Sequence, residues 1–365
     1  MDVNFLDLFN FDLFSDSSDS SSSEADSENE NLQIIRYKHY IRDVFNPFEK
    51  YNDIEFRIRY RFSKQSTMYA LLPLVESYLQ RSDNRGLPIS PVIQLRVSAD
   101  LAEVSVPTVS RVVLRVTNLL ASYFHKFIGF PSNEAHVAEN GSLFKKLGYG
   151  EGGIGLPNIS GAIDCTHIRL TNVNLHGETE LFRNRKGFYF LNVQAIVGPR
   201  MEFLDLVPEW PGSQHDSTIF KNSRAFIRYQ HQEIAGILIG DKGYPALTFL
   251  LTPFRNPQIV EQERYNEIQS HTRQVVERAF GVWKRRFPCL SKGLTLKIET
   301  CTSIVVACAV LHNLSLIYNE VLPESEMELL NESHHTSDNE NYEINEIEAG
   351  DGFLLRERIV QELFA

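Results

Sequence analysis

With 365 residues, 42% of them hydrophobic, the chain can bury a sizeable core and is long enough for one large or two modest domains. The net charge is −11, but residues 1–31 and 319–352 contain 20 acids and no Lys or Arg, so the rest of the chain has a net charge of +9. This basic remainder fits either a polyanionic partner or an ordinary solvated surface. The longest clear apolar run, Ile304–Leu311, is too short to span a membrane, and the acidic start is unlike a signal peptide. We therefore expect a soluble intracellular protein without a membrane partner. The four cysteines lack the spacing of a zinc site.

Both acidic segments lack the hydrophobicity needed to repay the entropy of ordering. The first contains the run SDSSDSSSSEADSENEN, and we expect residues 1–32 to be a disordered acidic tail. Its aromatic stretch FLDLFNFDLF either folds on a partner or belongs to a solubilising tail. We expect residues 319–365 to be a second acidic and largely disordered tail, and neither tail to be needed for folding.

Residues 33–90 show mainly helical spacing of apolar residues, and we expect a small helical domain over residues 33–150. Within it, SADLAEVSVPTVSRVVLRVTNLL has the pattern of a helix-turn-helix, with Ser105 able to cap the second helix. Arg111 and Arg115 would then be available to DNA phosphates or base edges. Two packed helices with a polar face can also produce this pattern.

From about residue 155 the pattern changes to strands. The runs ISGAIDCTHIRL, FYFLNVQAIV and MEFLDLVPEW predict three strands, SQHDSTIFKNSRAFIRYQ predicts a helix, and GILIGDKGY predicts a fourth strand. A long helix through RQVVERAFGVWKRRF and another at residues 302–318 follow. This order predicts an α/β fold over residues 151–318, an RNase H-like mixed sheet with flanking helices, preceded by the helix-turn-helix-like domain.

Two acids lie where such a fold brings strands together. Asp164 follows Ala162 and Ile163 on the first strand, and Asp241 ends the apolar run of the fourth, which neighbours the first. An acid in a buried strand is costly unless it is paired or binds a metal. Carboxylates at strand ends and on a facing helix can hold two Mg²⁺ ions about 3.5 to 4 Å apart for phosphodiester cleavage.

The facing helix supplies the third acid, Glu277. Arg273, Glu277 and Lys284 project within about 40° of one another on an ideal helix, so one face offers a carboxylate between two cations suited to DNA phosphates. Taken alone, Arg273 and Glu277 could equally be an ordinary i,i+4 surface ion pair.

Six segments together carry a specific resemblance: GAIDCTH, PGSQHDS, IGDKGYP, LLTPF, RQVVERAFGVWKRRFP and ACAVLHN. They resemble the nuclease domain of the PIF/Harbinger transposase-derived family of DDE superfamily endonucleases, in order and over residues 160–318. In that family the positions of Asp164, Asp216, Asp241 and Glu277 are assigned as divalent-metal ligands. The similar signature of bacterial insertion-sequence transposases adds Arg273 and Lys284 as supporting residues.

The resemblance implies a DNA endonuclease that uses Mg²⁺ or Mn²⁺ and hydrolyses or transfers phosphodiesters by a two-metal mechanism, with Asp164, Asp241 and Glu277 as catalytic acids. Asp216 remains open, because an Asp before STIF at a helix start is either a ligand or a helix cap. The alternative function is a domesticated, non-catalytic, DNA-associated scaffold, although a scaffold has no need to retain all four acids.

The resemblance also implies a separate Myb-like or SANT-like DNA-binding partner that supplies site recognition and nuclear entry. We therefore expect a nuclear location with a cytoplasmic pool. The helix-turn-helix is shorter here than is usual in the family, which agrees with dependence on such a partner. Whether the protein forms oligomers is open.

Overall fold

The computed structural model describes residues 46–80, 106–149, 153–171, 181–183, 187–320 and 351–364. The chain divides into two compact units, Met1–Val116 and Thr117–Ala365, which are considered separately below. The expected tail at residues 1–32 and the expected first helix of the helix-turn-helix lie outside the described residues.

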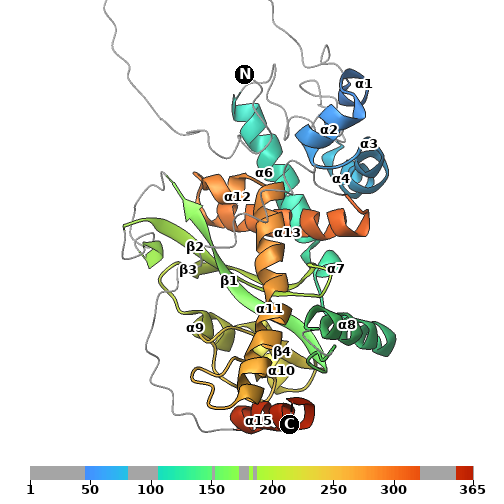
Figure 1. Cartoon of the computed structure of the whole chain (residues 1–365). Helices are drawn as coiled ribbons and strands as arrows, with labels where there is room; N and C mark the ends of the chain where they lie inside the picture. The colour runs from blue at the N-terminus through green and yellow to red at the C-terminus, as the bar shows by residue number, and fades with distance from the viewer. Residues whose placement is uncertain are drawn as a thin grey trace, which may run out of the picture. The chain divides into compact units, whose positions relative to one another are not determined.

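The first unit consists of short helices in its described part: α1 (Pro47–Lys50), α2 (Asp53–Tyr60), α3 (Lys64–Ser66), a π-helical turn (Thr67–Leu71) and α4 (Leu72–Leu79) (Figure 1). Asn52 and Glu55 form a reciprocal capping box that satisfies the first backbone N–H groups of α2. Phe56, Val75 and Leu79 are buried and supply the local core. The expected second helix of the helix-turn-helix is α6 (Val106–Ser122), which crosses the boundary between the units.

The second unit is built on a five-stranded sheet of order β3-β2-β1-β4-β5. Its strands are β1 (Ile159–Leu170), β2 (Tyr189–Val197), β3 (Phe203–Pro211), β4 (Ile237–Ile239) and β5 (Leu250–Leu251). The first three strands pair antiparallel, whereas β4 runs parallel to both β1 and β5. The predicted mixed sheet, with the first and fourth strands adjacent, is confirmed.

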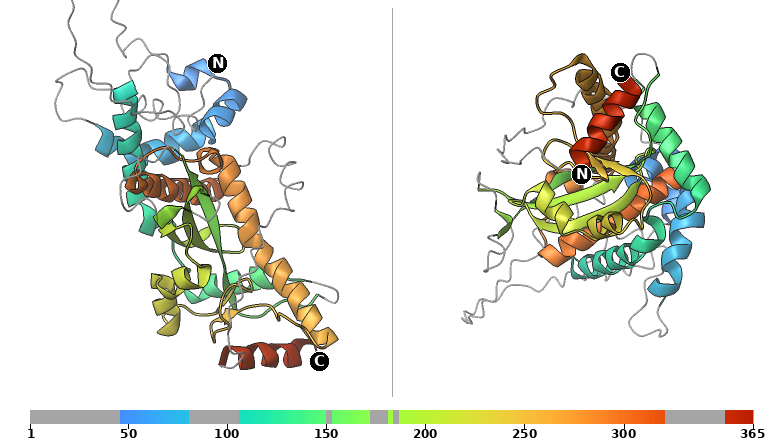
Figure 2. Two further views of the ribbon diagram at one scale, coloured as in Figure 1. Left: turned by 90° about the vertical axis from the view of Figure 1, so that its left-hand side faces the viewer. Right: turned by 90° about the horizontal axis from the view of Figure 1, so that it is seen from below.

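Helix α11 (Val260–Arg286) runs along one face of the sheet, with α9 (Asp216–Lys221) and α10 (Arg224–Gln230) on the other side (Figures 1 and 2). Its buried residues recur at helical spacing, from Tyr265 and Ile268 through Val275 and Val276 to Trp283. Two of the remaining helices, α8 (Glu134–Leu147) and α12 (Cys289–Lys292), pack on β1, while α7 (Phe124–Phe127) packs on α13. The expected domain boundary at residue 150 is therefore too late, because α8 packs on the sheet.

Helix α13 (Ile298–Ile317) carries the LHN end of the last motif. The Asn313 side chain accepts from Phe203 N and donates to Phe203 O, which ties α13 to the start of β3. Buried His312 lies 2.8 Å, through Nε2, from Met201 O in the β2–β3 turn. By length and composition α13 could cross a membrane, which the longest apolar run did not indicate. However, 67% of its most apolar window is buried inside the protein, as in the core helix of a soluble protein.

A helix closes the described C-terminal part of the chain, α15 (Asp351–Phe364), packed on α11 and β5 (Figures 1 and 2). Ile359 and Val360 are buried, and the guanidinium of Arg356 lies 3.8 Å from the centre of the Phe254 ring and donates to Pro253 O. The expectation of a largely disordered tail over residues 319–365 is wrong for this helix. It packs against β5, the last strand at that end of the sheet, and an uncovered edge strand is open to pairing with other chains.

Candidate active site

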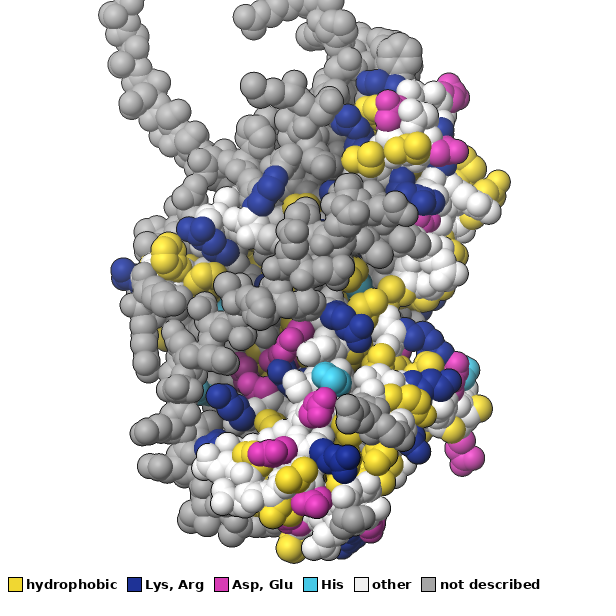
Figure 3. All heavy atoms as spheres, in the orientation of Figure 1, with side chains coloured by type: hydrophobic (Ala, Val, Ile, Leu, Met, Phe, Trp, Pro, Cys, Tyr) yellow, Lys and Arg dark blue, Asp and Glu magenta, His cyan; other side chains and the backbone are white. Residues whose placement is uncertain are grey.

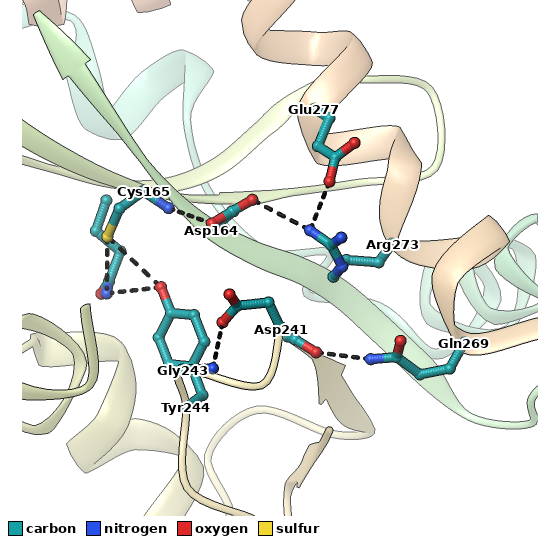
Figure 4. Close-up of polar contacts among 10 residues, drawn as sticks. Asp164, Cys165, Asp241, Gly243, Tyr244, Gln269, Arg273 and Glu277 are labelled. Carbon is teal, nitrogen blue, oxygen red and sulfur yellow. Dashed lines mark hydrogen bonds and ion pairs between the residues drawn. The ribbon is translucent and has the colours of Figure 1, made fainter. Parts of the chain in front are cut away.

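The register of the sheet brings Asp164 and Asp241 together. Ala162 on β1 pairs in parallel with Ile239 on β4, and each aspartate follows its paired residue by two positions. Because β4 ends at Ile239, both carboxylates lie where the sheet opens (Figure 4). The Gly243 N–H donates to Asp241 Oδ1 at 2.9 Å, and Gln269 of α11 donates to Gly240 O at 2.6 Å, so the end of β4 is held from both sides.

Helix α11 contributes an ion-pair bridge. Arg273 Nη1 lies 3.3 Å from Asp164 Oδ2 and 2.7 Å from Glu277 Oε1, as Figure 4 shows. The i,i+4 ion pair between Arg273 and Glu277 is therefore present, and Arg273 also contacts Asp164 of the sheet. Glu277 reaches the cluster through the Arg273 guanidinium, with a side chain that is 41% exposed against 18% for Asp164.

Asp216 is the first residue of α9, and its N-cap is His215, which makes no side-chain capping hydrogen bond. The Asp216 carboxylate instead turns to β2, where Asn192 Nδ2 donates to its Oδ1 at 3.2 Å. Gln194 donates to the Asp216 backbone carbonyl at 3.2 Å. The structure thus places this side chain against the sheet rather than over the helix terminus, which removes the main argument for a capping role.

The three aspartates lie close enough for their charges to affect one another. Burial raises the pKa of Asp164 to about 8; Arg273 opposes this rise, while the charges of Asp241 and Asp216 add to it. Burial also raises the pKa of Asp241, with a further contribution from Asp216. Three carboxylates from β1, the end of β4 and α9 therefore repel one another when ionised.

Neutral polar side chains pack beside the aspartates. The Cys165 thiol lies 3.5 Å from the Tyr244 hydroxyl, to which Gln194 donates at 3.3 Å. Burial raises the pKa of both Cys165 and Tyr244, which keeps them neutral. Buried Asn192 retains an Oδ1 without a hydrogen-bond partner, a cost that proteins commonly accept at functional sites. Sequence reasoning missed these residues, although polar side chains at alternate positions of the apolar run LNVQAIV are the signal that could have found them.

The carboxylates of this cluster are the donors available to a divalent cation. Within the described ranges, no three His, Cys, Asp or Glu side chains stand as a ready metal-ligand group. Arg273 contacts both Asp164 and Glu277 in this cluster. The chemistry nevertheless fits, because Asp164, Asp216 and Asp241 offer hard carboxylate oxygens whose mutual repulsion a cation would relieve.

The residues expected to contact DNA lie in different surroundings. Lys284 Nζ donates to His167 O at 2.9 Å, and burial lowers the pKa of Lys284 to about 8, so this lysine fastens α11 to β1. Arg111 and Arg115 lie on the exposed side of α6 in the first unit, with Arg111 Nε donating to Pro107 O. On the face drawn in Figure 3, Lys and Arg side chains are scattered among acids and form no single continuous patch over the described residues.

Comparisons with known proteins agree with this geometry. Residues 163–313, which include all four acids, match the DDE superfamily endonuclease family. The chain is 32% identical over 276 residues to "Putative nuclease HARBI1" of Bos taurus, an alignment that covers 70% of this chain and 76% of the relative. The chain belongs to the Harbinger-derived DDE nuclease family.

Other members of this family are also similar. The Homo sapiens protein of the same name is 31% identical, again over 70% of this chain and 76% of its own length. "Protein ALP1-like" of Arabidopsis thaliana is 26% identical over 223 residues, covering 57% of this chain and 53% of the relative. No solved structure matches the chain.

Proposed function

We propose that this protein is a metal-dependent DNA endonuclease of the DDE type. The observation that carries the proposal is the convergence of Asp164, Asp216 and Asp241, from three separate elements, on the place where β4 ends beside β1. A domain with no catalytic task has no reason to gather three mutually repelling carboxylates there.

In this proposal Asp164, Asp216 and Asp241 hold Mg²⁺ or Mn²⁺. When bound, the divalent cations polarise the phosphodiester and stabilise the leaving oxygen. The chain's own residues prepare the site: Gly243 N–H orients Asp241, and Asn192 orients Asp216.

Arg273 and Glu277 have a shared role. In the protein without DNA the guanidinium contacts both Asp164 and Glu277. A DNA phosphate offers the same guanidinium another planar, bidentate partner. Phosphate binding would therefore release Glu277, which then serves as the fourth acid of the site.

The test is cleavage of supercoiled and linear DNA by the purified protein with and without Mn²⁺. Asp164→Asn and Asp241→Asn should abolish cleavage, and Asp216→Asn should reduce it strongly. Asp205→Asn is the matched control, because Asp205 is a shielded acid of the same sheet whose pKa burial raises to about 6, with Arg224 and Arg228 as its charged neighbours. If the parent cuts no DNA while still binding it, the scaffold function is correct instead.

We further propose that a separate Myb-like or SANT-like DNA-binding protein supplies site recognition and nuclear entry. The basic cluster at residues 284–286 supports this, because Lys284 bonds to His167 O and buried Arg286 donates to Glu320 O, so neither is presented as an import signal. In cells that lack such a partner, the isolated chain should stay largely cytoplasmic. Full nuclear entry there would contradict the idea.

A further inference from the structure

The face of the β1–β2 pair on which Asn192 contacts Asp216 continues as a strip of aromatic and basic side chains. Alternate residues of a strand share a face, and the register pairs His167 with Asn192 and Arg169 with Phe190. Phe188, which directly precedes β2, continues the alternation. We call His167, Arg169, Phe188 and Phe190 the β1–β2 strip.

The strip begins at the candidate active site. Asn192, which pairs with His167, is the residue that donates to the Asp216 carboxylate. Along β2, Phe190 lies two residues from Asn192 and Phe188 lies four, which corresponds to about 7 and about 14 Å in an antiparallel strand. Asp164 points to the other face, toward Arg273 of α11, so the strip adjoins the candidate site through Asp216. A DNA strand with one phosphate beside Asp216 can reach both rings.

The opposite face of the same strand behaves differently. Ile168 and Leu170 are buried there, with 0% and 3% exposure, whereas His167 and Arg169 are exposed. Phe188 is 47% exposed, although a large aromatic side chain gains most by burial. The strip is thus the accessible face of a strand whose other face is core.

Its side chains are arranged for stacking. The rings of His167 and Phe190 lie 5.6 Å apart, and the guanidinium of Arg169 lies 5.1 Å from the centre of the Phe188 ring. Aromatic rings interleaved with cations bind unpaired nucleotides, because every base has a flat face and every linkage has a negative charge. Paired bases inside a duplex cover their own faces and cannot use such rings.

We propose that the β1–β2 strip binds unpaired nucleotides of DNA next to the phosphodiester held at the aspartates. This inference rests on the proposed nuclease function, because DNA is taken as the substrate. It adds that the preferred substrate is a duplex with a single-stranded or melted flank, not a continuous duplex.

The test measures binding without divalent metal, by fluorescence anisotropy with a blunt duplex and with the same duplex carrying a short single-stranded flank. The parent should bind the flanked duplex more tightly. Phe188→Leu, which keeps an apolar side chain but removes the ring, should weaken that binding about tenfold and leave the blunt duplex almost unaffected. Phe188→Trp should retain the preference, because indole stacks at least as well.

Tyr149→Leu is the matched control, since Tyr149 is an aromatic residue of the same unit with similar exposure, 48%, outside the strip. Arg169→Gln is a second variant, for use if Phe188→Leu fails to fold, and it should lower the affinity for the flanked duplex and its dependence on salt. A flank containing 2-aminopurine should lose fluorescence on binding the parent, because stacking quenches this base, and should keep it with Phe188→Leu.

The inference is overturned if Phe188→Leu and Arg169→Gln, folded as the parent is, bind both duplexes as the parent does, or if Tyr149→Leu causes the same loss. Because binding needs no cleavage, the two proposals fail separately. A protein that selects the flanked duplex through Phe188 but never cuts contradicts the nuclease function alone. A protein that cuts DNA with no dependence on Phe188 contradicts the strip alone.

Discussion

Replacing Asp164 with Asn should stabilise the metal-free protein at neutral pH. Burial raises the pKa of Asp164 to about 8 from an ordinary value of 3.8, so the folded state disfavours the ionised form that the unfolded chain adopts. For a raised pKa the contribution to stability is fully present below pH 3.8 and is lost as pH rises to 8. At pH 7 the difference amounts to roughly 4 kcal/mol, a value that already includes the favourable charge of Arg273.

The measurement is urea unfolding of parent and Asp164→Asn in EDTA from pH 4.5 to pH 8. The variant should gain on the parent by about 4 kcal/mol at pH 7 and by little at the acidic end. Asp205→Asn gives a graded comparison, because its pKa of about 6 means that its gain stops growing near that pH. Mg²⁺ should raise the melting temperature of the parent more than that of Asp164→Asn. An Asn variant less stable than the parent at pH 7 would refute the reasoning.

Three further predictions concern parts of the chain away from the aspartates. Burial lowers the pKa of His312 to about 4, so the stability that this histidine contributes is present above pH 6.5 and is lost as pH falls toward 4. His312→Gln can still donate to Met201 O. In urea unfolding, this variant should show a smaller loss of unfolding free energy between pH 7 and pH 5 than the parent does. Deleting residues 1–31 should leave the melting temperature unchanged and tighten DNA binding at low salt, whereas truncation after Glu320 should lower the melting temperature by several degrees, because it removes the buried side chains of α15.

The sequence was sufficient for the sheet and for the two central acids because both depend on local periodicity and on strand order. Asp164 and Asp241 each end an apolar run, and the order of elements makes their strands neighbours. Nothing local decides Asp216, because an Asp at a helix start looks the same whether it caps or points elsewhere. The contact that decides it comes from Asn192, whose position depends on the pairing of β2 with β1.

The C-terminal helix was missed for a different reason. Averaged over residues 319–365, acidic composition dominates and indicates disorder. Within residues 351–364, however, Phe353, Arg356, Val360 and Phe364 recur at helical spacing. The acidic composition of the whole segment therefore concealed the helical periodicity of α15.

The spacing of Arg273 and Glu277 fits both an i,i+4 ion pair and a contact of Arg273 with a DNA phosphate. The contact with Glu277 is the shorter of its two ion pairs, at 2.7 Å, and lies on the more exposed side; the contact with Asp164, at 3.3 Å, lies on the buried side. A solvated pair exchanges partners at little cost, whereas a buried one does not. A phosphate arriving from solvent would therefore compete for Arg273 on the Glu277 side first, while the contact with Asp164 persists. In the proposed function the i,i+4 pair and the DNA contact would be two states of the same guanidinium, and spacing along the helix is compatible with both.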